Sequence, residues 1–419
     1  MSRLLLSGLF ASILLAARPV YAQEPPTLTL SQAIVEADAR NSEILAATQA
    51  IEIDRARLQQ IAPQPLVVGA GPTLGVDVPG GLGTLQTLNA GASQQLSPAG
   101  SLAAGRRVAT AGIAIATSQL QFTKRDVERR VINAYYALAS AQAQGRAALQ
   151  NVVTTQDLLH SAKLRKRAGA VGQFEVLRAN VELRRAQTES LRAQAAGRTA
   201  AIILNTLIGR FGSTNAERVQ LKTVPLSDQN EQSLFTRAVA IDPTVAQLHA
   251  SLEQADARVR LAQSQRAPSF SANAGFQVQR APINGMTSRG PTAGISMNVP
   301  LLDYGTIKGA VREAQASGAY AQAQLNSRNV QIRSEVSQAV ADVQSSRARQ
   351  SFATASLQQA EQSLKIAQFG YRQGALGTLD VLAARNALSN ARADYDQASA
   401  DLAAAVARLQ LLVGVPINQ

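Results

Sequence analysis

The stretch Arg167-Ala-Gly169-Ala-Val-Gly172-Gln-Phe-Glu175-Val-Leu177 returns later in the chain as Arg372-Gln-Gly374-Ala-Leu-Gly377-Thr-Leu-Asp380-Val-Leu382. The two copies lie 205 residues apart, since 374 − 169 = 205. The same offset pairs residues far outside these stretches: Gly209 with Gly414, Gly100 with Gly305, Leu96 with Leu301, and Pro63 with Pro268. An offset that holds without a gap across most of each half indicates that one structural unit is used twice.

A seven-residue spacing leads up to each copy. One series contains mostly large residues, Val131, Leu138, Gly145, Val152 and Leu159, and a second contains small ones, Ala134, Ala141, Ala148, Thr155 and Ala162. The partners 205 residues later are Val336, Val343, Gln350, Leu357 and Leu364, with Ala339, Ser346, Ala353, Ala360 and Ala367. A heptad sustained over about five repeats predicts long supercoiling helices, and alanine at one seam position lets their backbones approach closely.

Glycines follow each heptad segment and predict a turn. The first helix of each pair is expected to end at Gly169 to Gly172, or at Gly374 to Gly377. The next helix is expected to run from about Phe174 to Ile208, and from Leu379 to Val413 in the second copy. Because glycine adopts the left-handed dihedrals that close a tight turn, each pair is predicted to be an antiparallel hairpin. Helices of about 35 residues would reach ~50 Å, which is longer than a globular domain needs.

A different texture precedes each hairpin, from Pro63 to Pro98 and from Pro268 to Leu302, where apolar and polar residues alternate in short runs. We predict two strands per copy, joined by loops at Pro79–Gly83 and Ala281–Pro291. A strand of about ten residues is long enough to cross an outer membrane when tilted. Four strands cannot close a barrel in lipid, where open edges are not tolerated, so a membrane form would have to share its barrel with copies of itself.

The N-terminal residues predict a secretory signal peptide. Arg3 is followed by an apolar stretch from Leu4 to Ala17 and by Val20-Tyr21-Ala22, so residues 1–22 are predicted to be removed. An uncleaved membrane anchor is the alternative.

The chain contains no cysteine, which excludes disulfides, a cysteine-bound zinc and an acylated anchor. The predicted organisation is residues 23–222 as a first repeat of helix, two strands and hairpin, residues 223–230 as a linker, and residues 231–419 as a second repeat.

Composition argues against several classes of function. The formal charge is +13, and it falls to +11 when Arg3 and Arg18 leave with the signal. Since an exported protein does not meet nucleic acid, and since the basic residues are dispersed along helices among acidic ones, no nucleic-acid partner is expected. The only histidines, His160 and His249, have no motif spacing around them, and the chain has no glycine-rich phosphate loop. No enzymatic activity, cofactor or metal site is predicted.

The order of these parts resembles the TolC family of outer-membrane efflux proteins. The resemblance covers essentially the whole mature chain: a signal peptide, then a helix, a strand pair and a long hairpin with a Gly-x-x-Gly turn, all but the signal repeated once. Val299–Gly305 is similar to the family's strand-to-helix junction, and Tyr371–Leu382 is similar to its periplasmic tip. The motifs are individually weak, and their order and duplication make the match specific.

The resemblance implies a mainly α fold with a small β part. Long antiparallel coiled-coil hairpins would form a helical barrel in the periplasm, and each protomer would give four strands to a trimeric 12-stranded β-barrel in the outer membrane. The implied function is a passive exit duct of a tripartite efflux or type I secretion system. Its implied partners are two further copies of the chain, outer-membrane lipid, a periplasmic membrane-fusion adaptor and an inner-membrane pump of RND, ABC or MFS type.

The resemblance also points to site residues at the tip of the hairpins. Asp380 and its repeat partner Glu175 are candidates for the pore aperture, where three-fold symmetry would turn each into a ring of carboxylates. Either could instead be an acidic residue favoured at a helix N-terminus. Candidates for adaptor docking are the four turn glycines and two neighbours: Gly169, Gly172, Gly374, Gly377, Leu376 and Tyr371.

Two departures from the family pattern concern the closed state. Family members often carry a second acidic residue three positions after the one at Asp380, where this chain has Ala383. An arginine that helps to hold some members shut is Leu376 here.

An alternative function from another class is a periplasmic coiled-coil adaptor, although an adaptor has one hairpin flanked by lipoyl-like halves and no duplicated unit. A hydrolase is a third alternative, but the sequence shows no nucleophile paired with a general base.

Overall fold

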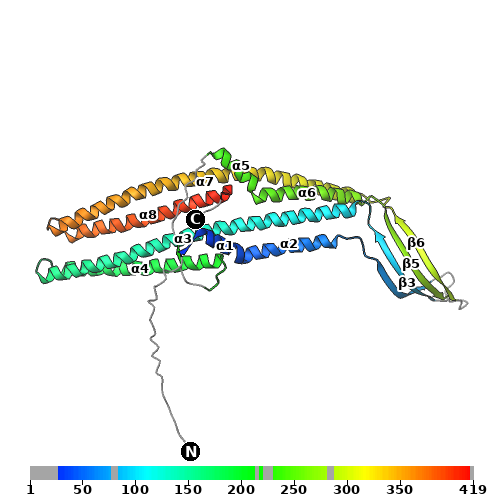
Figure 1. Ribbon diagram of the computed structural model, residues 1–419, viewed down its shortest axis with the longest axis horizontal. Helices are drawn as coiled ribbons and strands as arrows, with labels where there is room; N and C mark the ends of the chain where they lie inside the picture. The colour runs from blue at the N-terminus through cyan, green and yellow to red at the C-terminus, as the bar shows by residue number, and fades with distance from the viewer. Residues whose placement is uncertain (1–26, 77–83, 213–216, 220–229, 281–286, 416–419) are drawn as a thin grey trace, which may run out of the picture.

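The computed structural model describes residues 27–76, 84–212, 217–219, 230–280 and 287–415, which form an elongated molecule of long helices with a sheet at one end (Figure 1). The elements of the first half are β1 (Thr27–Leu28), α1 (Leu30–Arg40), α2 (Ser42–Gln60), β2 (Val67–Val76), β3 (Thr84–Leu96), α3 (Ser101–Arg167), α4 (Gln173–Leu207) and β4 (Arg218–Val219). Those of the second half are α5 (Glu231–Ile241), α6 (Pro243–Ser264), β5 (Ser269–Arg280), β6 (Thr287–Asn298), α7 (Thr306–Arg372) and α8 (Thr378–Val413). The predicted mainly α fold with a small β part is confirmed.

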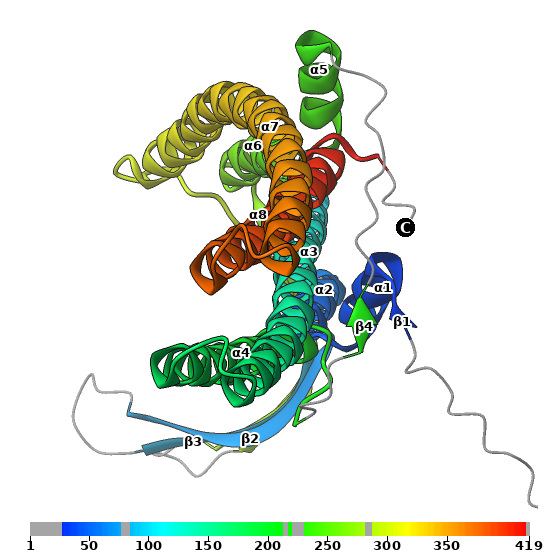
Figure 2. The same ribbon diagram turned by 90° about the vertical axis from the view of Figure 1, so that its left-hand side faces the viewer.

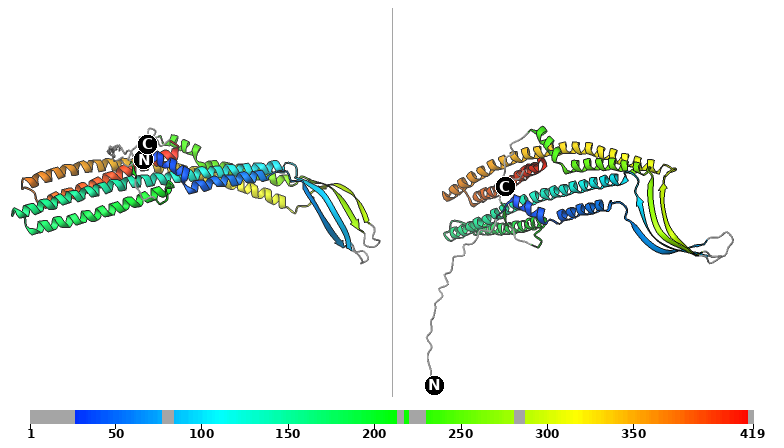
Figure 3. Two further views of the ribbon diagram at one scale, coloured as in Figure 1. Left: turned by 60° about the horizontal axis from the view of Figure 1, so that its bottom comes forward. Right: turned by 45° about the vertical axis from the view of Figure 1, so that its right-hand side comes forward.

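Two helices, α3 and α7, run most of the length of the helical part, and the hairpin turns lie at the end opposite the sheet (Figure 3). Each has 67 residues, or ~100 Å. This is nearly twice the predicted length, whereas α4 and α8, with 35 and 36 residues, match the prediction. Among the described residues, no helix combines the length and the apolar character that crossing a membrane requires.

The helices stand side by side as a curved wall (Figure 2). Towards the hairpin turns, α3 contacts α4 and α8, and α8 contacts α7, so the order across the wall is α4-α3-α8-α7. Towards the sheet, the contacts give the order α2-α3-α6-α7. The protomer therefore has two lateral edges, one formed by α2 and α4 and the other by α7.

The opening helix that the sequence predicted in each half is broken in two. Asn41 separates α1 from α2 with an extended backbone, and its Oδ1 accepts the N–H of Glu43 at 2.9 Å. In the second half Asp242 separates α5 from α6, its Oδ1 accepts the N–H of Val245 at 2.9 Å, and Pro243 begins α6. Both are N-cap residues, which end one helix and start another at an angle.

The short helices α1 and α5 pack on one face of the wall. Leu30, Ala33 and Ala37 of α1 lie in a buried cluster with Val127 and Val131 of α3. An equivalent cluster joins α5 to α7 through Leu234, Ala238, Ile332 and Val336. The two clusters hold the mid-height of the molecule together, and they leave the opposite face of the wall uncovered by either helix.

The sheet is antiparallel with the strand order β2-β3-β5-β6, so the two halves of the chain meet between β3 and β5. The predicted loop Ala281–Pro291 is too long, because β6 already begins at Thr287. Pro291 sits within this strand, which an edge strand permits since proline lacks a ladder donor. The predicted signal peptide (1–22), the loop Pro79–Gly83 and all of the linker 223–230 except residue 230 lie outside the described residues.

Candidate functional site

The two faces of the sheet differ in chemistry. On one face β5 presents Phe270, Ala272, Ala274, Phe276 and Val278, which are paired with mostly apolar residues of β3 and β6: Leu96, Ala92, Ala90, Leu88, Met297, Ile295, Ala293 and Pro291. Polar residues also occupy positions on this face: Gln94 and, at the end of the sheet far from the helices, Gln86, Arg280, Thr287 and Arg289. The other face carries uncharged polar residues and glycine: Ser271, Asn273, Gly275, Gln277 and Gln279 on β5, with Ser93, Gly91, Asn89 and Thr87 on β3 and Ser296, Gly294, Thr292, Gly290 and Ser288 on β6. Such an alternation suits a sheet with lipid on one side and water on the other.

Glycines allow β3 and β5 to approach closely on the polar face. Gly91 pairs with Gly275 in the register. A Cβ added at Gly91 would lie 2.8 Å from the carbonyl oxygen of Ala274, and one added at Gly275 would lie 2.8 Å from that of Ala90. Gly69, next in the same row on β2, has open space. The sequence alternation predicted the strands but gave no sign that this pair of glycines is obligatory.

The sheet ends in two open strands. Among the described residues, β2 pairs only with β3, and β6 pairs only with β5. Each therefore presents a row of unpaired backbone donors and acceptors on its outer side. Such edges require either water or another strand.

Residues at equal positions of the two repeats are buried to very different extents. Leu382 of α8 is 6% exposed because it packs against Leu158 and other residues of α3, whereas its partner Leu177 of α4 is 54% exposed. Likewise Ala407 of α8 is fully buried, and its partner Ile202 of α4 is 46% exposed. The difference follows from position, since α8 lies inside the wall and α4 lies at its edge.

Both hairpins turn in the same way. Gly169 and Gly374 have φ of +72° and +77°. In the first turn Ala170 N donates to Arg165 O at 2.9 Å and Gly169 N donates to Lys166 O at 3.0 Å, and the second turn repeats the pattern 205 residues later. This is a Schellman motif with glycine in the left-handed position. The other two turn glycines, Gly172 and Gly377, are N-caps with extended backbones, so the expectation of left-handed dihedrals is met at one glycine of each pair.

The two tips touch each other through residues near the turns. The guanidinium of Arg165 lies over the ring of Tyr371, 4.3 Å from its centroid. Within the second tip, Leu376 covers Gly370, where an added Cβ would lie 2.7 Å from its Cδ1. Tyr371 and Leu376, both predicted from the resemblance as docking residues, are therefore also structural parts of the tips.

The acidic candidates occupy equal positions but differ in contacts. Asp380 is exposed, and its Oδ2 accepts the N–H of Gly377 at 2.9 Å, so it caps α8. Glu175 is half-buried, and its Oε2 is buried without a hydrogen-bond partner among the described residues. Both carboxylates lie in the first turn of their helices, where the macrodipole favours an acidic residue, and Asp380 makes a capping hydrogen bond as well. Their role at an aperture stays a prediction. His160 and His249 are exposed on helix faces, and the described residues include no group of acidic or histidine ligands that could hold a metal.

Sequence reasoning missed a residue that joins α8 to α3 by a side-chain hydrogen bond. Arg385 Nη1 donates to the backbone oxygen of Thr154 at 2.7 Å, and burial lowers the pKa of this guanidinium. Its repeat partner is Asn180, so the repeat offered no signal.

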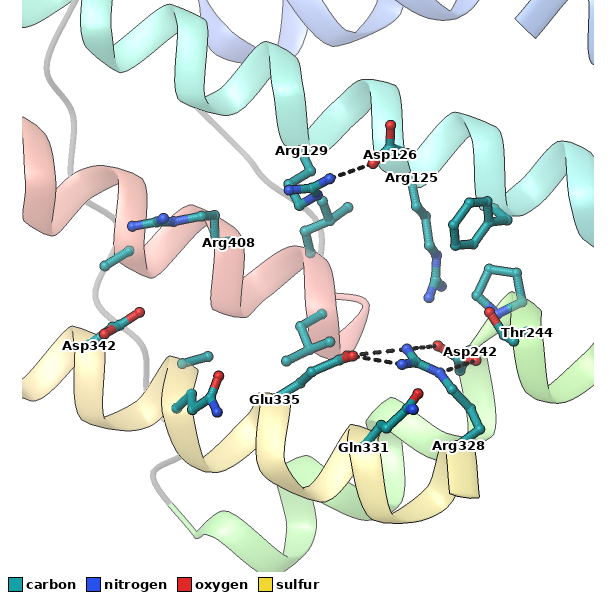
Figure 4. Close-up of a pocket in the computed structure, with 17 residues that line it drawn as sticks. Arg125, Asp126, Arg129, Asp242, Thr244, Arg328, Gln331, Glu335, Asp342 and Arg408 are labelled. Carbon is teal, nitrogen blue, oxygen red and sulfur yellow. Dashed lines mark hydrogen bonds and ion pairs between the residues drawn. The ribbon is translucent and has the colours of Figure 1, made fainter. Parts of the chain in front are cut away.

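A second missed arginine lies in a groove of about 630 Å³ where the start of α6 and the end of α8 come together between α3 and α7 (Figure 4). Arg328 of α7 binds Asp242 at 2.9 Å and Glu335 at 2.6 Å. Asp242 therefore caps α6 and neutralises Arg328 with the same carboxylate. Arg125 and Arg408 also line the groove, from α3 and α8.

The first half has its own arginine cluster. Arg210, which follows α4, donates to both carboxylate oxygens of Glu36 on α1 at 2.7 Å and to Glu217 at 2.7 Å. The hydrogen bonds from Arg210 lower the pKa of Glu36. Arg210 thereby fixes α1 to the end of the first hairpin.

Comparison with known proteins agrees with this architecture. Residues 234–415 match the family described as outer membrane efflux protein. A stretch of 284 residues is 24% identical to the cobalt-zinc-cadmium resistance protein CzcC of Cupriavidus metallidurans, covering 67% of this chain and 66% of that relative. The chain thus matches just under two thirds of the relative's length.

Solved structures share the fold over most of the chain. The outer membrane protein VceC of Vibrio cholerae gives a TM-score of 0.73 at 21% identity, covering 92% of this chain and 96% of that one. The CmeC outer membrane channel of Campylobacter jejuni gives 0.76 at 17% identity, with 92% and 85% covered. The MtrE outer membrane channel of Neisseria gonorrhoeae gives 0.73 at 18% identity, with 92% and 88% covered. The resemblance found from the sequence is confirmed.

Proposed function

We propose that the chain is a member of the outer membrane efflux protein family, whose pattern matches residues 234–415, and that it is the outer-membrane exit duct of a tripartite efflux or type I secretion system, working as a homotrimer. The sheet would cross the outer membrane, and the helical wall would project into the periplasm. Transport through such a duct is passive, because the energy comes from an inner-membrane pump. Residues 1–22 are proposed to be the signal peptide, and residues 223–230 the linker between the repeats 23–222 and 231–419.

One observation carries the proposal: positions that are buried in the α8–α3 seam are exposed on α4. If α7 of one protomer packs against α4 of the next, as α3 packs against α8 within a protomer, Leu177 and Ile202 become buried as Leu382 and Ala407 are. The contact joins two different surfaces, so it is heterologous and closes into a ring when the rotation permits. The open edges of β2 and β6 would pair in the same arrangement and complete a closed barrel.

The chemistry of the sheet and of the hairpin tips supports a water-filled duct. The uncharged polar face of the sheet would line the pore, and the apolar face with Phe270, Phe276, Ile295 and Met297 would contact lipid. At the other end, three copies of exposed Asp380 would approach the tunnel mouth and favour cations there. The hairpin tips would meet a membrane-fusion adaptor, which couples the duct to an RND, ABC or MFS pump.

The repeat gives a specific test of the ring. Leu382 packs in a cluster with Leu158, and 158 + 205 places Ser363 of α7 opposite Leu177 of the neighbouring protomer. Ser363 is exposed in the single chain. Since the chain has no cysteine, the double variant Leu177→Cys/Ser363→Cys introduces the only two thiols.

Oxidation of that variant in outer-membrane fractions should give covalent trimers on a denaturing gel. The matched control pairs Leu177→Cys with Lys308→Cys, which is exposed near the sheet end of α7 and should give none. Purified trimers should also give discrete conductance in a planar bilayer, and Asp380→Asn should reduce its cation preference. A soluble or inner-membrane protein without cross-links or conductance would instead support the periplasmic adaptor.

A further inference from the structure

The two hairpin tips carry different charge at equal positions. Residues 163–175 contain four basic residues and one acidic residue, a net charge of +3: Lys163, Arg165, Lys166, Arg167 and Glu175. The equivalent residues 368–380 contain one of each, Arg372 and Asp380, and are neutral. The backbones of the two tips are alike, so the difference lies in the side chains alone.

The positive charge of the first tip is not neutralised within the chain. Among the described residues, no carboxylate lies within 4.0 Å of any of its four basic groups; the ion pairs of α3 and α4 lie farther from the turn. Arg165 is held over Tyr371, and Lys166 contacts the amide oxygen of Gln173. Lys163 and Arg167 are exposed.

Helix capping does not account for this cluster. A cation in the last turn of a helix interacts favourably with the macrodipole, but α7 meets that need with Arg372 alone. The last turn of α3 has three basic residues in a row, Arg165, Lys166 and Arg167, which repel one another. Clustered like charges on an exposed turn are favourable when an opposite charge binds them.

Apolar residues lie beside the charges. Leu164 at the end of α3 and Phe174 at the start of α4 are both exposed. The turn lies at the end of the molecule farthest from the sheet (Figure 1), where a periplasmic partner would approach. A surface with exposed apolar groups surrounded by cations suits a partner segment that has an apolar anchor flanked by carboxylates.

We propose that Lys163, Leu164, Lys166, Arg167 and Phe174, here called the basic tip, form a docking surface for an acidic hairpin end of the periplasmic adaptor. This proposal rests on the proposed function and adds the chemistry of the partner. In a trimer, three basic tips would alternate with three neutral tips around the tunnel mouth. An adaptor ring would therefore bind in two non-equivalent ways, with the salt-sensitive part of its affinity at the basic tips.

The test uses the detergent-solubilised full-length protein and two synthetic antiparallel helical hairpins as probes. They share one apolar residue in the turn, and one carries three glutamates around it while the other carries three lysines. The variant Lys163→Gln/Lys166→Gln/Arg167→Gln removes charge but keeps Arg165, which contacts Tyr371. The matched control is Lys365→Gln/Arg372→Gln, which removes the one basic residue of the second tip and a lysine about one helical turn before that tip.

Fluorescence anisotropy should show the glutamate hairpin binding the wild-type protein at least about tenfold more tightly than the lysine hairpin. The triple variant should lose that preference, and the control should retain it within about twofold. Raising NaCl from about 50 to 300 mM should weaken binding to the wild type and leave the triple variant nearly unchanged. Equal affinities for the two hairpins, no binding of either, or an equal loss in the control would overturn the proposal.

A lipid surface is the other anionic partner to test. Binding to phosphatidylglycerol vesicles that depends on the same three residues, without binding of the glutamate hairpin, would assign the surface to lipid and overturn the proposal. Planar-bilayer conductance separates the two levels of inference. If the triple variant conducts like the wild type while the hairpin results fail, only the docking proposal is wrong; if the wild type does not conduct, the duct itself is in doubt.

Discussion

The two halves of the molecule share a backbone but hold their mid-height helices in place with different ion pairs. In the first half Arg210 binds Glu36 and Glu217, and its side chain is 26% exposed. In the second half Arg328 binds Asp242 and Glu335, with side chains of Arg328 and Asp242 that are 17% and 9% exposed. Neither arginine has a basic repeat partner, because the equivalent residues are Val415 and Thr123. The repeat thus specifies where helices lie, and unrelated side chains fix them there.

The largest expected difference between the halves comes from removing these arginines. Arg328→Gln leaves the buried carboxylate of Asp242 unpaired and should cost about 3 kcal/mol, whereas Arg210→Gln acts on a more exposed pair and should cost about 1 kcal/mol. Hydrogen exchange should report faster opening at the first turn of α6 in the first variant and only modest changes at α1 in the second. Equal protection losses would show that burial does not distinguish the two clusters.

A second difference lies where the halves meet in the sheet. Gly91→Val should force β3 and β5 apart, because its Cβ would meet a backbone oxygen, and should cost about 2 kcal/mol. Gly69→Val, in the same row but with open space, should leave trimer yield in the outer membrane nearly unchanged in a heat-dissociation gel assay. If both variants lower the yield alike, the close approach of β3 and β5 is not what requires glycine.

The two hairpin turns have the same backbone conformation, so equivalent glycine substitutions should destabilise them equally. Gly169→Ala and Gly374→Ala place a side chain at positive φ and should each destabilise the tip by about 1 kcal/mol. Gly172→Ala and Gly377→Ala keep extended backbones that alanine adopts, and they should change stability by less than about 0.5 kcal/mol. The rate of limited proteolysis at the turns would measure how far each variant is destabilised. Faster cleavage of the variants at residues 172 and 377 than of the variants at residues 169 and 374 would contradict the assignment of the left-handed positions.

The sequence predicted the hairpin turns well, but it did not predict the part of the helical wall that lies near the sheet. The 205-residue offset located the ends of α3 and α7, at Arg167 and Arg372, because glycine and the heptad mark them directly. The sheet-proximal half of α3 carries no such pattern. There it packs through small residues such as Gly105 and Gly112, which approach Ile61 and the side chain of Gln254.

Other features were readable but unused, or not readable at all. Asn41 and the pair Asp242-Pro243 are cap signatures that predict the helix breaks. The partners of Arg328, by contrast, include Asp242, which lies 86 residues earlier in the chain, and no local pattern links them. The residues that fix the repeat in space therefore required the structure.

The smallest expected effect concerns one position where the halves carry opposite charge. Burial raises the pKa of Glu128 on α3, and nearby Asp38 adds to the shift, whereas its repeat partner Arg333 lies over the ring of Phe235 at 4.7 Å. A carboxyl whose pKa is higher in the folded state binds its proton more tightly there, so stability falls as pH rises through about 4.5 towards the folded pKa.

Glu128→Gln removes that cost. The variant should therefore unfold at a higher temperature than the wild type at pH 7.5, and the gain should vanish near pH 3, where Glu128 is protonated in both states. The exposed residue Glu189 on α4 supplies the control, since Glu189→Gln should not change the unfolding temperature at either pH. A gain of equal size at both pH values would mean that packing, and not the buried charge, distinguishes Glu128 from its partner in the second half.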